Sequence, residues 1–179
     1  MKIVMLDRDG VINEDSPDFI KSVAEWKPIP GSIEAIARLS HAGFRVFIAS
    51  NQSGIGRGLM DFDALFAIHD RVQRAVNELG GRVDAIAFAP EHPDQATEMR
   101  KPQPGMLKDL ARRLQVDLER VPFVGDSLAD VQAARAAGAR PILVRSGNGR
   151  DTEAAHREEL QGVAIFDDLA AAATALIAA

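Results

Sequence analysis

The chain has 179 residues, an apolar fraction of 46%, a formal net charge of −5 at pH 7 and no cysteine. This length and apolar fraction fit one globular domain, the acidic balance argues against general nucleic-acid binding, and the missing cysteines exclude disulfides, thiolate metal sites and cysteine nucleophiles. The chain begins with a strand-like run and has no apolar stretch of membrane-spanning length, so we expect a soluble, cytoplasmic protein with no membrane partner.

Short apolar runs alternate with stretches of helical periodicity. The strand candidates are residues 2–6, 45–49, 85–89, 122–124, 141–144 and 163–166. The helix candidates are residues 32–42, 61–79, 104–115, 128–137 and 167–178. Gly43 and Gly138 lie where a helix should end before the next strand. This alternation predicts an α/β fold, a three-layer αβα sandwich around a parallel, Rossmann-like sheet, with a single domain over residues 1–179.

Three segments interrupt this alternation, namely residues 11–30, 51–59 and 90–103. Each follows a predicted strand, so all three should emerge at the carboxyl edge of the sheet, where open α/β folds bind ligands. The first is interpreted as either a loop or a hairpin over that edge. None is long enough for a separate folded unit, so we expect an open site without a large cap domain.

Two carboxylates follow the first predicted strand. Asp7 and Asp9 come directly after the run Ile3–Leu6 and lie two residues apart. Residues two apart share a face of an extended chain, so both side chains can point into one crevice. One aspartate can then attack a phosphoryl group while the other moves the protons. The alternative interpretation of these residues by themselves is a strand that ends in a polar turn.

Further polar residues are expected at the same edge of the sheet. Ser50 follows the second strand, the pair Arg100 and Lys101 precedes a helix, and Asp126 follows the fourth strand. With Asp7, these residues supply the nucleophile, hydrogen-bond donors, lysine and acidic Mg²⁺ ligands that phosphoryl transfer needs. Taken singly, each also fits a strand end, a solvated charge or a helix cap.

The chain resembles the haloacid dehalogenase superfamily of phosphohydrolases through four motifs in order: DRDG, FIASN, RKPQPGM and GDSLAD. The segments DRDGVIN, SNQSGIGRG and RKPQPGM are similar to the branch of heptose 1,7-bisphosphate 7-phosphatases and histidinol-phosphate phosphatases. The resemblance implies removal of the C7 phosphate of the heptose bisphosphate in ADP-heptose and lipopolysaccharide core synthesis. Histidinol phosphate or another small sugar phosphate is the alternative substrate.

The resemblance also implies roles for individual residues. It implies that Asp7 is the nucleophile, that Asp9 is the general acid/base, and that Ser50 and Lys101 stabilise the phosphoryl group. It implies that Mg²⁺ is held by Asp7, the main-chain carbonyl of Asp9, and Asp126. The segments that contact substrate in the family correspond here to Asp15, Ser16, Pro17, Asp18, Asn51, Gln52, Ser53 and Arg100.

One departure from this branch concerns zinc. Many of its members carry a Cys/His zinc site in the loop before RKP, whereas residues 89–99 here hold one histidine, His92, and no cysteine. A structural zinc site prefers thiolates or several histidines. We therefore expect Mg²⁺ as the cofactor and no zinc.

Two other functions remain open. A polynucleotide 3′-phosphatase shares the superfamily chemistry, but the acidic balance and the lack of basic tracts count against a nucleic-acid partner. A non-enzymatic sensor or scaffold on this fold predicts degraded motifs, whereas all four are intact here. We expect a monomer whose partner is a small-molecule sugar phosphate.

Overall fold

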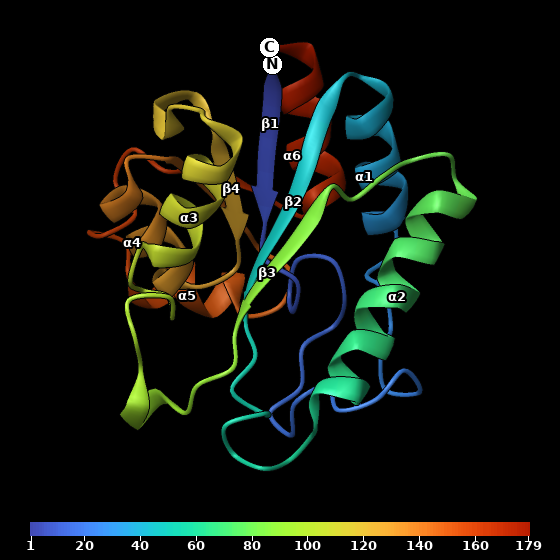
Figure 1. Ribbon diagram of the computed structural model, residues 1–179. Coiled ribbons are helices and arrows are strands. Elements are labelled where there is room, and N and C mark those ends of the chain that lie inside the picture. Colours follow the sequence, from blue (N-terminus) through green and yellow to red (C-terminus); the bar gives the residue numbers. More distant parts are fainter.

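The computed structural model describes residues 1–179 and contains one sheet of six parallel strands in the order β3-β2-β1-β4-β5-β6 (Figure 1). The strands are β1 (Lys2–Leu6), β2 (Phe44–Asn51), β3 (Ala85–Ala89), β4 (Pro122–Gly125), β5 (Arg140–Val144) and β6 (Ala164–Phe166). The helices are α1 (Ser32–His41), α2 (Phe62–Glu78), α3 (Gly105–Leu114), α4 (Leu128–Ala137), α5 (Gly149–Ala155) and α6 (Leu169–Ala178). The predicted α/β fold with a parallel sheet is confirmed.

Helices cover both faces of this sheet because its central strands are apolar on both sides. In β1, Val4 and Leu6 pack in a core with α1, α2 and α6, whereas Ile3 and Met5 pack in a second core with α3. Figure 1 shows α1 and α2 on one side of the sheet and α3 and α4 on the other. A strand buried on both faces has a continuous apolar sequence, which the run KIVML shows. None of the helices combines the length and apolar character needed to cross a bilayer.

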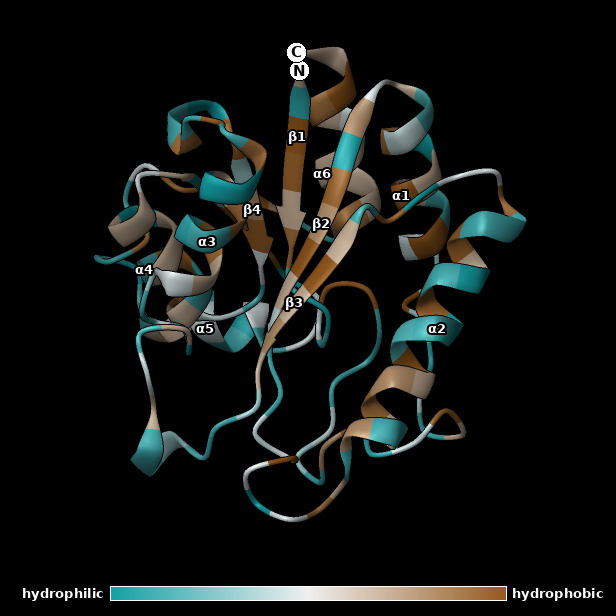
Figure 2. Ribbon diagram, viewed as in Figure 1, coloured by the Kyte–Doolittle hydropathy of each residue, from teal (hydrophilic) through white to brown (hydrophobic).

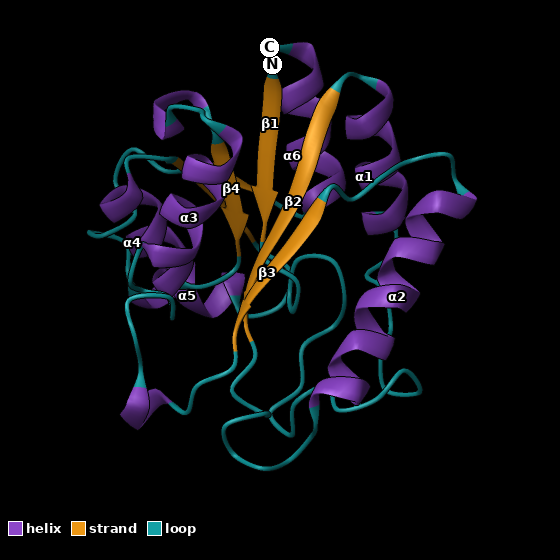
Figure 3. Cartoon of the chain, in the orientation of Figure 1, coloured by secondary structure: helices purple, strands orange, loops and turns teal.

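The order of the strands reverses at β1. The chain moves from β1 through β2 to β3 on one side, and then from β4 to β6 on the other. A crevice forms beyond the carboxyl ends of the strands at such a switch point. Figure 3 shows the loops after β1, β2 and β3 gathered at this edge, and Figure 2 shows long hydrophilic stretches in these loops.

Besides shifts of one or two residues at element ends and two short 3-10 helices, Pro93–Gln95 and Leu118–Arg120, the structure departs from the predicted elements as follows. β2 continues through Ser50 and Asn51, because these residues pair with Phe88 and Ala89 of β3. Helix α5 was not predicted, since seven residues are too few for a clear helical periodicity. Residues 11–30 form a loop with isolated bridges at Asn13 and no strand, which settles the choice between a loop and a hairpin.

The first core depends on well-packed aliphatic side chains. Ile36 of α1 is fully buried in it. We expect Ile36→Ala to lower the free energy of unfolding by about 2–5 kcal/mol, because the change removes buried methyl groups and leaves a cavity. Urea denaturation measures this. Val23→Ala is the control: Val23 is 39% exposed, so its loss should change stability by less than about 0.5 kcal/mol. Equal losses for both variants would contradict this account of the core.

Candidate active site

Asp7 is fixed at the carboxyl end of the central strand. Its main-chain N–H donates to the carbonyl of Val124 at 2.8 Å, which joins β1 to β4 beyond the last strand pair. Its Oδ1 accepts from the main-chain N–H of Arg8 at 2.7 Å and lies 3.0 Å from Lys101 Nζ. Oδ2 accepts no hydrogen bond from the protein. One oxygen of Asp7 is therefore anchored while the other remains available to a bound group.

Lys101 forms the central ion pairs of the site. Its Nζ lies 2.7 Å from Asp130 Oδ1 and 3.0 Å from Asp7 Oδ1, and it donates to the carbonyl of Ala49 at 3.0 Å. The main chain of Lys101 is held from β2 as well. Its N–H donates to Asn51 Oδ1 at 3.0 Å, and its carbonyl accepts from Asn51 Nδ2 at 2.9 Å. The residue is buried, and the three contacts of Nζ give each hydrogen of the ammonium a partner.

Asp126 follows β4 and is held by a loop that sequence reasoning missed. Its Oδ2 accepts from the main-chain N–H of Asn148 at 2.8 Å and from Asn148 Nδ2 at 3.2 Å. The same amide donates to Asp15 Oδ2 at 2.9 Å, which links the loop after β1 to this carboxylate. The sequence signal for Asn148 was a polar, glycine-containing segment after a predicted strand, which is the signal that marked the other loops of the site.

Asp130 lies in the first turn of α4 and has no free oxygen. Its Oδ1 pairs with Lys101, and its Oδ2 accepts from Ser127 Oγ at 2.7 Å and from the main-chain N–H groups of Ser127 and Asp126 at 3.1 and 3.2 Å. Ser127 in return caps α4, so the two residues form a capping box. Asp130 therefore positions Lys101 and the start of the helix.

Two glycines let this crevice close. A Cβ at Gly10 would lie 2.0 Å from Asp126 Oδ2, and a Cβ at Gly147 would lie 2.3 Å from the same atom. Both glycines also have positive φ angles, of 80° and 56°, which other residues seldom adopt. The loops after β1 and β5 can approach the Asp126 carboxylate only because these positions lack side chains.

Burial and charge shift the acid–base equilibria of the site. Burial raises the pKa of Asp7, with Lys101 opposing this and the neighbouring carboxylates adding to it. Burial also raises the pKa of Asp126 to about 7, and the charge of Asp130 contributes to that rise. Burial alone would lower the pKa of Lys101, but Asp130 and Asp7 outweigh it and raise that pKa. The lysine is therefore charged, and the neighbouring carboxylates repel one another.

A cavity of about 300 Å³ opens between these residues. Most of the residues expected at the site line it: Asp7, Asp9, Asp15, Ser16, Pro17, Ser50, Asn51, Gln52, Ser53, Arg100, Lys101 and Asp126. Asp18 does not; it lies in a neighbouring hollow, where its main-chain carbonyl accepts from Lys21 Nζ at 2.7 Å. The cavity is also lined by residues that sequence reasoning did not select: Phe19, Ile20, Ala129 and Asn148. Ser127 and Asp130, which belong to the motif GDSLAD but had no role assigned from the sequence, line it too.

Three carboxylates of the site form a possible metal centre. One oxygen from each of Asp7, Asp126 and Asp130 lies within 4.8 Å of the others. Asp130 is saturated by Lys101 and Ser127, so the free donor atoms belong to Asp7 and Asp126. Carboxylate oxygens suit a hard cation such as Mg²⁺, and the raised pKa of both residues indicates that a nearby positive charge would stabilise them.

Comparison with known sequences places the chain among hydrolases. Residues 98–172 match the family model described as HAD-hydrolase-like. The chain is 52% identical over 177 residues to D-glycero-β-D-manno-heptose-1,7-bisphosphate 7-phosphatase of Bordetella bronchiseptica, covering 99% of this chain and 98% of that protein. It is 51% identical over 175 residues to the enzyme of the same name from Pseudomonas aeruginosa, covering 98% and 97%.

Solved structures agree with these sequences. The D,D-heptose 1,7-bisphosphate phosphatase of B. bronchiseptica, crystallised with magnesium and phosphate, superposes with a TM-score of 0.97 at 52% identity, over 99% of both chains. The corresponding enzyme of Burkholderia thailandensis has a TM-score of 0.78 at 46% identity, over 100% of both chains. Relatives this similar over nearly the whole chain show that it belongs to the family of heptose 1,7-bisphosphate 7-phosphatases, within the haloacid dehalogenase-like hydrolases.

Proposed function

We propose that this protein hydrolyses the C7 phosphate of D-glycero-β-D-manno-heptose 1,7-bisphosphate, and that residues 1–179 act as one catalytic domain. The names of the relatives supply the substrate and the β anomer. One observation in the structure carries the chemistry: Asp7 has one oxygen anchored by Lys101 and the Arg8 amide and the other free at the cavity. A carboxylate held in this way is suited to attack phosphorus in line.

The reaction has two steps on the residues of the site. Asp7 Oδ2 attacks phosphorus, and Asp9 gives a proton to the leaving sugar oxygen as the phosphorus–oxygen bond breaks. Water then attacks the aspartyl phosphate, Asp9 takes a proton from that water, and Asp7 is released with inorganic phosphate. Lys101 and the Ser50 hydroxyl offset the negative charge on the phosphoryl oxygens during both steps.

Mg²⁺ is the cofactor that fits this donor set. We propose that Asp7, the main-chain carbonyl of Asp9, and Asp126 hold it. When bound, Mg²⁺ neutralises part of the charge on the phosphoryl oxygens. The structure of the B. bronchiseptica relative with magnesium and phosphate supports this assignment. The absence of a zinc site stays a prediction, which elemental analysis of the purified protein can test.

The cavity has room for the sugar as well as for one phosphoryl group, and positive charge lies at its mouth. Arg100 lines the cavity. The guanidinium of Arg57 lies 5.4 Å from the ring centre of Phe19, which also lines it. We propose that the sugar hydroxyls bind near Asp15 and Asn51, and that Arg100 binds the remote phosphate, since a guanidinium can bond a phosphate at two oxygens.

The first expected outcome concerns the nucleophile and the phosphate removed. The wild-type protein with Mg²⁺ should convert the heptose bisphosphate to heptose 1-phosphate, which ³¹P NMR of the product identifies. Asp7→Asn should lower this rate by roughly 10²–10⁴-fold or more, because an amide does not attack phosphorus. A product that keeps the C7 phosphate would refute the heptose assignment. If histidinol phosphate turned over faster than the heptose bisphosphate, it would become the assigned substrate, and the phosphatase assignment would be unchanged.

The second expected outcome concerns metal binding and needs no activity assay. The pKa of Asp126 is about 7 in the folded protein against a usual 3.8, so the folded state binds the extra proton between these values. The stability due to this proton is present at low pH and is lost as the pH rises through 7. Asp126→Asn should therefore raise the melting temperature of the metal-free protein at about pH 8 much more than at about pH 5.

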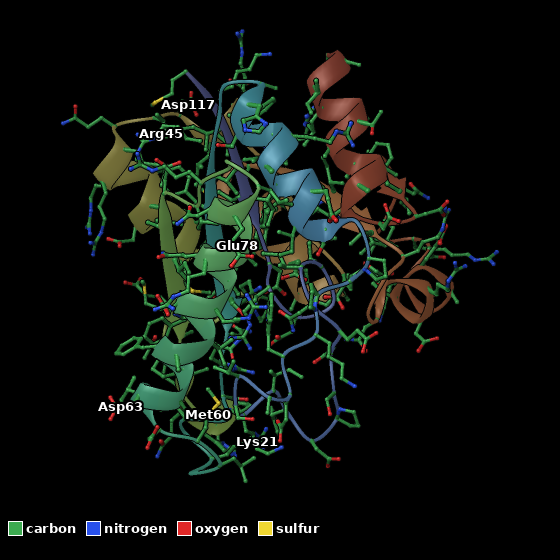
Figure 4. The ribbon with its side chains drawn as sticks, turned by 90° about the vertical axis from the view of Figure 1, so that its right-hand side faces the viewer. Lys21, Arg45, Met60, Asp63, Glu78 and Asp117 are labelled. Atoms are coloured by element: carbon green, nitrogen blue, oxygen red, sulfur yellow. The ribbon has the colours of Figure 1, made fainter.

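The second part of this test measures the melting temperature with Mg²⁺ added. Mg²⁺ should raise the melting temperature of the wild-type protein at about pH 8 and have little effect on Asp126→Asn, because binding to the folded state alone stabilises it. Asp117→Asn is the matched control, since Asp117 is exposed and lies far from the site near the other end of the molecule (Figure 4). The metal assignment fails if Mg²⁺ shifts Asp126→Asn and the wild type equally.

The third expected outcome distinguishes the roles of the adjacent residues Arg100 and Lys101. Lys101→Ala should chiefly lower kcat, because the ammonium acts on the phosphoryl group, whose charge arrangement changes in the transition state. Arg100→Ala should chiefly raise KM and reduce the preference for the bisphosphate over a monophosphate. Steady-state kinetics on both substrates measures this, with circular dichroism to verify folding. An unchanged KM in Arg100→Ala would remove Arg100 from substrate recognition.

A further inference from the structure

Asp9 is held by side-chain donors on both of its carboxylate oxygens. Its Oδ1 accepts from Arg8 Nε and from Asn13 Nδ2, both at 2.9 Å. Its Oδ2 accepts from Arg8 Nη2 at 3.1 Å and from Gln52 Nε2 at 3.0 Å. Two donors on each oxygen use the full capacity of a carboxylate. The plane and the direction of this side chain are therefore fixed by three neighbours.

The neighbours of Asp9 also fix one another. Gln52 Oε1 accepts from Arg8 Nη2 at 3.1 Å, while Gln52 Nε2 donates to Asp9 and, at 2.8 Å, to Ser50 Oγ. The opposite orientation of this amide would turn its oxygen toward the carboxylate and its NH₂ group toward the guanidinium, so the charges of Arg8 and Asp9 decide the orientation. The network thus joins the loop after β1 to the end of β2.

Arg8 is the cationic member of the network, and Asp9 is its counterion. It is fully buried, with 0% of its surface exposed, and its only ion pair is with Asp9. His69 of α2 does not compete with Arg8 for the Asp9 carboxylate, because burial and the charge of Arg8 lower the pKa of His69 to about 4. A buried arginine is costly unless it is paired and hydrogen-bonded. Such a residue directly after the proposed nucleophile needs a reason beyond packing.

We propose that Arg8 is a positioning residue for the proton transfers of the reaction: its guanidinium fixes the carboxylate of Asp9 where the leaving oxygen and the attacking water arrive. This inference rests on the proposed function, in which Asp9 is the general acid/base. Arg8 does not contact the substrate and acts through Asp9. Gln52 can turn away to free Oδ2 for a proton without leaving a charge unpaired, whereas Arg8 cannot, so Arg8 is the constant support.

The leaving group gives a test that a merely structural role would not pass. A sugar alkoxide needs a proton as it leaves, whereas p-nitrophenolate leaves readily without one. In Arg8→Met, single-turnover cleavage of the heptose bisphosphate should fall at least about tenfold, a share of the roughly 10²–10⁴-fold that general acid–base catalysis supplies. Cleavage of p-nitrophenyl phosphate should fall less than about threefold in its first step. Hydrolysis of the aspartyl phosphate should slow, so this substrate should show a burst of p-nitrophenol.

Three further variants control this experiment. Arg8→Lys keeps the charge but lacks the planar fork that fixes both oxygens of Asp9, so it should show the same pattern more weakly and serves if Arg8→Met does not fold. Arg8→Met should cost nothing more in an Asp9→Asn background, since residues that act through one another are not additive. Arg45→Met breaks another arginine–aspartate pair, 3.2 Å from Asp84, near the opposite end of the molecule (Figure 4). It should leave both rates unchanged.

The outcomes separate the two proposals. Equal losses on the two substrates without a burst, or full additivity with Asp9→Asn, would overturn the positioning role of Arg8 and leave the phosphatase assignment intact. A wild-type protein that cleaves neither substrate with Mg²⁺ present would overturn the proposed function and this inference with it. Selective loss on the sugar phosphate, with the burst and the non-additivity, would support both.

Discussion

The buried ammonium of Lys101 is the contact on which the rest of the site depends. It bridges Asp7 and Asp130 at 3.0 and 2.7 Å in a crevice that also holds Asp126. Without this charge, three carboxylates would face one another with no protein cation between them, and their mutual repulsion would oppose folding. Lys101 reaches this position because Asn51 at the end of β2 bonds both main-chain groups of the same residue.

The balance of charge around Lys101 remains incomplete in the metal-free protein. One ammonium faces three carboxylates, and the pKa of both Asp7 and Asp126 is raised as a result of burial and of their neighbours. Asp130 differs from them in its contacts, because Lys101 and Ser127 occupy both of its oxygens. The site is thus least stable where a cation and a phosphoryl group are proposed to bind. This is the pattern expected of a site in which binding and catalysis have priority over the stability of the empty protein.

The fold was predictable from local patterns, whereas some site contacts were not. The run KIVML predicted a central strand because burial on both faces removes polar residues. Gly138 predicted a helix end because of its residue type, and the structure confirms it with a left-handed C-cap at φ 81°. The motif residues were found because they follow strands or, for Arg100 and Lys101, precede a helix at one edge of the sheet. Asn148 and Asp18 show the limit: one contacts Asp126 and the other lies outside the cavity, and these placements depend on how long loops fold back.

The contacts of Arg8 were also not predictable from the sequence, because part of its surroundings comes from residues that are distant along the chain. It pairs with the adjacent Asp9, but Gln52, which accepts from its guanidinium, lies 44 residues away along the chain. Asp7 and Asp9 thus have different cations: a lysine that acts as a point charge and leaves one oxygen free, and an arginine whose planar fork holds a whole carboxylate. A nucleophile needs a free oxygen, and a proton-transfer group needs a fixed direction. The choice of cation at each aspartate therefore matches the step proposed for it.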